Sequence, residues 1–232
     1  MSIFGIIKSD DKVFTGDKFR IMVNESFLAP ALTFATKSHE ISLDNGVTWY
    51  DVSSKKQLDW VFDAAGTQTI SLRISTTEPS SATVTKEIEV LDITTQNLFS
   101  NDHDLYVLEP DIDKYLPKSW SSWNLIHLKA QEYIMDWLNE KRIFKQDGSS
   151  FAPSDLLEKQ EVKQFSVAKA LEFIFEGNSN VVGDISSVKR DKYKLMANEK
   201  ASRSQLALNY NGTTTEAKNG RIDMMTVKLN RR

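Results

Sequence analysis

The spacing of apolar residues changes near the middle of the chain. In the first ninety residues apolar side chains alternate with polar ones, as at Phe19, Ile21 and Val23. Beyond about residue 120 they recur every three or four positions, as at Trp123, Ile126 and Ala130. Alternation is typical of a half-buried strand, and the longer period is typical of a helix with one apolar face. The sequence therefore predicts two domains, an all-β unit followed by a mainly α-helical unit.

The N-terminal half contains several short strand patterns separated by turn residues. Ile41 and Leu43 lead into Asn45-Gly46, a pair that tolerates positive φ and predicts a hairpin turn. Further alternating residues are Ile70, Leu72, Ile74, Val84, Ile88 and Val90. Short strands at this spacing are typical of a β-sandwich. Because the chain has no cysteine, we expect Trp49 to serve as the core plug without a disulfide.

This half resembles the immunoglobulin-like family, in particular its bacterial PKD-like branch. The resemblance covers about residues 10–92 and is carried by SLDNGVTWYDV at 42–52 and WVFDAAGTQTISLRI at 60–74. It implies an immunoglobulin-like β-sandwich, and we assign residues 1–92 to that domain.

The second half predicts about three main helices and an extended C-terminal tail. The helices are expected over about 121–141, from Pro153 to Gly177, and from Asp184 to about Leu208. Ser119 or Ser122 can cap the first helix by accepting a bond from a free backbone N–H. Asn211-Gly212 is a turn signal that precedes the tail.

Two different segments connect the halves. The polar stretch 93–103 predicts a linker. The next stretch, DLYVLEPDIDKYLPKSW at 104–120, is more apolar, and its prolines disfavour helix at Glu109 and Leu116. We expect an irregular strap docked on the helical core, as the first element of a second domain over 104–232.

The residues that carry chemistry are few. Of the three histidines, His127 is expected to pack at a helix edge and His103 to be an exposed linker residue. Asp111 and Asp113 are expected to be solvated turn carboxylates, because two-residue spacing does not direct both toward one ion. We therefore expect no catalytic residue, no cofactor, no metal site and no enzymatic activity, although a Ser–His–Asp site assembled in space stays open.

Charge is unevenly distributed along the chain. Residues 188–232 hold eleven Lys and Arg against four Asp and Glu, whereas residues 1–187 are acidic on balance. Such asymmetry favours attraction between subunits or to an acidic partner. The start, MSIFGIIKSDDK, lacks the pattern of a signal peptide, and no stretch is long and apolar enough to span a bilayer. We expect no membrane association and synthesis in a reducing cytoplasm.

The second half resembles the head–tail adaptor, or connector, proteins of tailed bacteriophages. The ordered features are DLYVLEPDIDKYLP, SWNLIHLKAQEYIMDWLNEKRIF, AKALEFIF, VKRDKYKLMANEKASRSQLAL and a closing KLNRR, over about residues 103–232. One departure is a neutral turn at 209–220, where relatives often have an acidic, EF-hand-like one, so no ion site is inferred there.

The adaptor resemblance implies a structural virion protein in the phage neck. Such proteins form a homo-oligomeric ring, commonly twelvefold, that joins the portal protein to downstream tail or neck proteins and contacts the genomic DNA in the exit channel. The tail would meet the portal or a neighbouring copy, through Arg221, Lys228, Arg231 and Arg232. The alternative is an immunoglobulin-like binding module for carbohydrate or a host surface, anchored to the virion by the helices.

Overall fold

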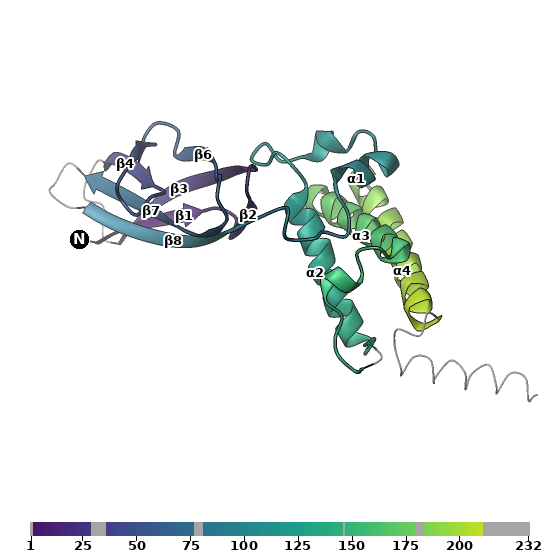
Figure 1. The fold of residues 1–232 in the computed structure, drawn as a ribbon. Coiled ribbons are helices and arrows are strands. Elements are labelled where there is room, and N and C mark those ends of the chain that lie inside the picture. The colour runs from purple at the N-terminus through teal and green to yellow at the C-terminus, as the bar shows by residue number, and fades with distance from the viewer. Residues whose placement is uncertain (1, 29–35, 77–80, 146, 180–182, 211–232) are drawn as a thin grey trace, which may run out of the picture. The chain divides into compact units, whose positions relative to one another are not determined.

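The computed structural model describes residues 2–28, 36–76, 81–145, 147–179 and 183–210 (Figure 1). The chain divides into two compact units. The β unit holds Met1–Gln96 and Pro117–Ser122, and the helical unit holds Asn97–Leu116 and Trp123–Arg232. The two-domain prediction is confirmed, with a β-sheet domain first and helices after it.

The β unit consists of two sheets. Its strands are β1 (Ser2–Lys8), β2 (Lys12–Phe14), β3 (Lys18–Leu28), β4 (Thr36–Ser42), β5 (Tyr50–Asp51), β6 (Gln57–Val61), β7 (Gly66–Thr76) and β8 (Ser81–Leu91). One sheet has the order β1-β3-β6 and the other β2-β8-β7-β4-β5. All neighbours are antiparallel except β2 and β8. This order corresponds to the A-B-E and G-F-C sheets of an immunoglobulin-like sandwich.

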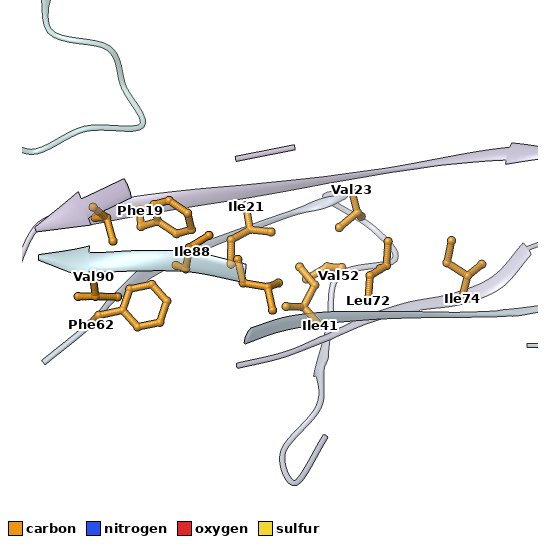
Figure 2. Packing of buried hydrophobic residues seen from close by; sticks show 12 residues of the cluster. Phe19, Ile21, Val23, Ile41, Val52, Phe62, Leu72, Ile74, Ile88 and Val90 are labelled. Atoms are coloured by element: carbon orange, nitrogen blue, oxygen red, sulfur yellow. The ribbon is translucent and has the colours of Figure 1, made fainter. Parts of the chain in front are cut away.

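The core of the β unit is built by the alternation seen in the sequence. Ile21, Ile41 and Leu72 are fully buried, and they come from both sheets (Figure 2). Ile70 of β7 is fully buried as well. Their neighbours along the strands face outward, as does Met22 at 49% exposure. Burial of these side chains in one shared cluster holds the two sheets together.

The turn between β4 and β5 is longer than the predicted hairpin. Asn45 and Gly46 do adopt positive φ, at 56° and 87°. Trp49 lies in this turn and is only half-buried, so the prediction that it plugs the core is wrong. Its indole N–H donates to the Gly46 carbonyl at 2.9 Å, and the Arg73 guanidinium lies 4.2 Å from its ring centroid. Trp49 therefore closes the turn, and aliphatic residues with Phe19 and Phe62 fill the core.

In the described part of the chain, the helical unit consists of three long helices, a short α-helix and two short 3-10 helices. They are α1 (Asp102–Leu108), η1 (Ile112–Tyr115), α2 (Asn124–Glu140), η2 (Pro153–Asp155), α3 (Gln160–Asn178) and α4 (Ile185–Tyr210). The three predicted long helices are confirmed to within a few residues at their ends, except that Pro153 opens the short η2 and α3 starts later. Residues 165–172 of α3 are buried without interruption, because α3 packs against both α2 and α4.

The connecting segments differ from their predictions. Phe99 is buried in the helical core, so the second half of the predicted linker 93–103 belongs to the helical unit. The 104–120 segment is not an irregular strap throughout, since α1 and η1 occupy most of it. Asn101 caps α1 by a reciprocal capping box with Asp104, which anchors the helix start.

The predicted serine cap of the long helix at 121–141 is absent. Trp123 is the N-cap residue of α2, and no side chain caps it. Ser122 instead donates to the Asp17 carboxylate at 2.7 Å, and the Ser121 hydroxyl accepts from the Lys18 backbone N–H at 2.8 Å. These bonds assign the 117–122 stretch to the β unit.

Candidate functional site

The outer face of α4 carries apolar side chains that no other part of the described chain covers. Ile185, Val188 and Leu195 are 72%, 60% and 72% exposed. Their spacing of three and seven residues places them on one side of the helix, together with Lys192. We call these four residues the α4 outer stripe. Large aliphatic residues grouped on a surface are typical of a contact site for another protein.

The opposite face of α4 is its contact with α3. Tyr193, Ala197, Ala201 and Leu208 are buried there at 1%, 2%, 8% and 2% exposure. The two alanines have small side chains, so the helix backbones can approach closely. At the start of α4 the Ser187 backbone N–H donates to the Asp184 side chain at 2.5 Å, as in an N-cap. Since α4 is packed inward by one set of residues, the outer stripe is a second apolar set that its own fold does not use.

Charged residues of both signs lie along α4. Lys192 and Lys194 are exposed, and Arg190 pairs with its neighbour Asp191 at 2.8 Å. Further along the helix Arg203 pairs with Glu199. By their spacing along the helix, Asp191 and Glu199 lie on the side of the outer stripe, and Lys194 lies away from it. The outer stripe therefore combines apolar contact with charges of both signs.

A buried carboxylate fixes the rotation of α4. Glu109, at 8% exposure, accepts bonds from the Tyr193 hydroxyl and the Lys189 ammonium group, both at 2.6 Å. Burial raises the pKa of Glu109, but the bonds from Lys189 and Tyr193 together outweigh it and the net pKa is lowered. Burial, and then the bond to Glu109, raise the pKa of Tyr193. The ring of Tyr193 also stacks on Phe175 of α3 at 5.7 Å.

Residues 104–116 contact the helical core through Glu109. The sequence predicts that this segment docks on the helical core. Glu109 makes that contact through Tyr193, and Tyr115 makes it through Phe175, whose ring centroid is 5.0 Å from its own. The expected solvation of Asp111 and Asp113 is confirmed, since both are exposed. Asp113 accepts from the Tyr106 hydroxyl, a bond that raises the pKa of Tyr106 to about 12. Within the described residues, no group of His, Cys, Asp and Glu is arranged to hold a metal ion.

A buried polar network lies under α2. His127 Nδ1 is 2.8 Å from the Ser100 hydroxyl, and His127 Nε2 is 3.2 Å from the Asp102 carboxylate. The Ser100 hydroxyl is also 2.8 Å from that of Ser166. An ionised carboxylate only accepts, so Nε2 carries a proton, and in that neutral tautomer of the imidazole Nδ1 accepts from the Ser100 hydroxyl. His127 is fully buried and does not lie at a helix edge as predicted.

This network contains the residue types of a hydrolase triad, but its serine and histidine are not accessible to a substrate. Ser100 is 3% exposed and His127 is 0% exposed, so surrounding protein covers the hydroxyl and the imidazole. A nucleophile must meet its substrate at hydrogen-bond distance. The arrangement instead satisfies the polar groups of α1, α2 and α3 where they meet, which is what buried polar side chains require. His103 is exposed as predicted, although on α1.

The four residues predicted to form the portal or ring interface, Arg221, Lys228, Arg231 and Arg232, lie outside the described residues, as does the neutral turn from 211 onward. The outer stripe was not predicted from the sequence, which indicated only the range of this helix. A signal for it is present in the sequence. Ile185, Val188 and Leu195 form one apolar set at helical spacing, and Tyr193, Ala197 and Ala201 form a second set on the other side.

None of the helices in the described part of the chain is both long and apolar enough to cross a membrane.

No protein-family model and no curated protein sequence matches this chain. Among solved structures, a cohesin module from a Clostridium perfringens family 33 glycoside hydrolase aligns over 38% of this chain and 96% of its own, with 12% identity and a TM-score of 0.25. Murine CRIg aligns over 38% of this chain and 98% of its own, with 12% identity and a TM-score of 0.23. Scores this low carry no inference, so the immunoglobulin-like assignment depends on the strand order itself.

Proposed function

We propose that this protein is a structural virion component, a ring-forming adaptor in the neck of a tailed bacteriophage. It would join the portal to the tail and line or seal the DNA exit channel. The observation that carries the proposal is the α4 outer stripe, because an exposed apolar face on a helix already packed on its other side is suited to a partner protein. Synthesis would take place in the bacterial host cytoplasm.

The order of elements in the helical unit supports the same proposal. The adaptor resemblance rests on the 104–117 segment, a first long helix, an apolar second helix and a charged third helix. These sequence features fall on α1 with η1, then α2, α3 and α4. The proposed partners are the portal protein, neighbouring copies in a ring of about twelve, downstream neck or tail proteins, and the genomic DNA as a non-specific contact.

Co-sedimentation with the portal of the same virus tests this function. We expect the full chain to sediment with portal rings, and to do so less at high salt, because ions screen the attraction of the basic residues 188–232 to an acidic surface. A chain that stays in the supernatant with portal rings at every salt concentration would contradict the adaptor function.

The alternative, an immunoglobulin-like module for carbohydrate or a host surface, has less support in the β unit. Glycan-binding surfaces use flat exposed aromatic rings, whereas Trp49 is half-buried and Arg73 covers its ring. A glycan array tests this alternative directly, and strong selective binding by the full chain would favour it.

A further inference from the structure

An apolar groove lies between α1, α3 and α4 of the helical unit. Its volume is about 300 Å³, at the lower end of the range found for ligand pockets. Val107 and Leu108 of α1 are 68% and 39% exposed there. Val167 of α3 and Met196 of α4 complete the apolar lining. Water therefore covers a surface that is mostly hydrocarbon, and burial of that surface under an apolar segment is favourable.

Charge at the groove is unbalanced by one positive group. Among the described residues, the charged side chains that line it are Asp104, Lys163 and Lys200. The Lys163 ammonium group pairs with the Asp104 carboxylate at 2.8 Å, so these two charges cancel. The Lys200 ammonium group donates to the amide oxygen of Gln164, also at 2.8 Å, and a neutral amide leaves the positive charge in place. Glu199, next to Lys200 in the chain, is paired with Arg203. An occupant suited to the groove is therefore apolar and carries one carboxylate.

We propose that residues 222–225 of the C-terminal tail occupy this groove in their own copy, with Asp223 paired to Lys200. Their sequence, IDMM, places three apolar side chains around one carboxylate. Asp223 is the only acidic residue among the last sixteen of the chain, and the basic Arg221 and Lys228 lie outside the segment. Methionine side chains are flexible and fill irregular apolar surfaces. The segment therefore has the composition that the groove requires.

The length of the tail allows it to reach back to the groove. Lys200 lies ten residues before the end of α4 at Tyr210, about 15 Å along the axis at the helical rise of 1.5 Å per residue. Asp223 follows thirteen residues after that end, and an extended chain of this length spans up to about 43 Å. The excess leaves room for the chain to reverse direction, for which Asn211-Gly212 is a turn signal.

A groove in the same copy is favoured over one in another copy. A segment joined to its binding site by a short chain is present at an effective concentration in the millimolar range. The inference goes beyond the adaptor function, because this docking needs neither a portal nor a second copy.

Disulfide formation within single chains tests the docking, since the natural chain has no cysteine. In the full chain, Val107→Cys places a thiol at the groove and Met224→Cys places one in the tail segment. The double variant is treated with a mild oxidant at low protein concentration. We expect an intramolecular disulfide, measured by mobility on non-reducing gels and by the mass of the linked peptides.

A matched control pairs Met224→Cys with Val188→Cys, which is an exposed valine of α4 outside the groove. Val188 lies about 33 Å before the end of α4 by the helical rise. The fourteen tail residues up to Met224 span up to about 46 Å when extended, so the tail can reach this position too. We expect the disulfide with Val107→Cys to form at least about tenfold faster than the control disulfide, because docking raises the local concentration of the tail thiol.

An exchange of charges tests the pairing of Asp223 with Lys200. Asp223→Lys, added to the Val107→Cys and Met224→Cys variant, changes the tail alone. We expect it to slow the disulfide several-fold, because it places two ammonium groups together. Lys200→Glu added to that chain reverses both charges, and we expect it to restore the rate. Helical circular dichroism checks the fold of each variant, and Asp223→Lys alone decides the matter where Lys200→Glu loses helix.

Three results would overturn the proposal. The first is equal disulfide rates for Val107→Cys and Val188→Cys. The second is disulfide-linked dimers as the main product at low concentration, which would place the tail in another copy. The third is an unchanged rate with Asp223→Lys. All three are measured on the chain alone, so co-sedimentation with the portal decides the adaptor function separately.

Discussion

The Tyr193 hydroxyl donates to the Glu109 carboxylate at 2.6 Å, and both groups are buried. This bond joins the segment after α1 to the inner face of α4. It therefore helps to set which residues of α4 face the core and which face outward. The direction of the outer stripe depends on it.

Removal of that hydroxyl should destabilise the helical unit. Tyr193→Phe keeps the ring stack on Phe175 but leaves a buried carboxylate oxygen of Glu109 with less hydrogen bonding, at a cost of about 1–3 kcal/mol. Urea denaturation followed by helical circular dichroism measures the change. Asp111→Asn is a matched control, because its pair with Lys114 is about 70% exposed on both sides, and we expect a change within about 0.5 kcal/mol. Equal effects of the two changes would contradict the role of the Glu109 bond.

Asp44 should make the turn after β4 sensitive to strong acid. Bonds from the backbone N–H and side chain of Thr48, and from the hydroxyl of Ser42, lower the pKa of Asp44 to about 2. Because the folded pKa is lower than the unfolded one, the stabilisation is complete above about pH 4 and is lost as pH falls through about 2. An NMR titration of the Asp44 carboxyl checks the value, and an ordinary pKa near 3.8 would contradict it.

The same turn gives a second readout of Asp44. We expect Asp44→Ala to lower the melting temperature at neutral pH, and we expect its melting temperature to approach that of the natural chain near pH 2. Calorimetric melting of both proteins across that range makes the comparison. A constant difference at all pH values would indicate that the carboxylate charge is not the cause.

We predict that His127 stabilises the folded state of the helical unit. His127→Ala removes a buried ring and leaves Ser100 and Asp102 without its two bonds, so we expect a loss of about 2–4 kcal/mol. Chemical denaturation measures this loss. His103→Ala serves as the control, because that histidine is exposed. Unchanged stability, or a hydrolase activity that disappears with His127, would favour the triad interpretation instead.

The two faces of α4 should respond differently to substitution. Leu195→Gln changes an exposed position, and we expect its effect on the free energy of unfolding to stay within about 0.5 kcal/mol. Ala197→Leu overfills a buried contact and should cost about 1–3 kcal/mol. Denaturation curves of the two variants provide the comparison. A large loss from Leu195→Gln would mean that the outer stripe is part of the fold of a single copy.

Truncation tests whether the C-terminal residues bind the portal. A chain ending before Lys228 lacks Lys228, Arg231 and Arg232, and we expect it to lose portal binding while its helical circular dichroism and melting temperature stay unchanged. Co-sedimentation with portal rings measures the loss. Full binding by the shortened chain would remove these residues from the interface.

Alternation and helical spacing were enough to predict most of the core. Ile21, Ile70 and Leu72 were expected to face inward, and all are fully buried. Hydrophobic period determines the buried face of an element, so such residues follow from the sequence alone. The position of Trp49 could not be predicted in this way. Hydrogen bonds of Ser42 and Asp44 hold the turn in a shape that does not continue the alternation.

The short helices show what proline does and does not restrict. Proline disfavours helix at the residue before it, which here means Glu109 and Leu116. α1 ends at Leu108 and η1 ends at Tyr115, so a helix fits before each restricted residue. The buried Ser100–His127–Asp102 network could not be predicted, because its members come together only through tertiary packing.

Electron microscopy of the full chain mixed with portal rings from the same virus tests the central claim most directly. We expect an added ring of density on one end of the portal, formed by copies that contact one another side by side. Bare portal rings accompanied by single unbound copies of this chain, at high protein concentration and low salt, would contradict it.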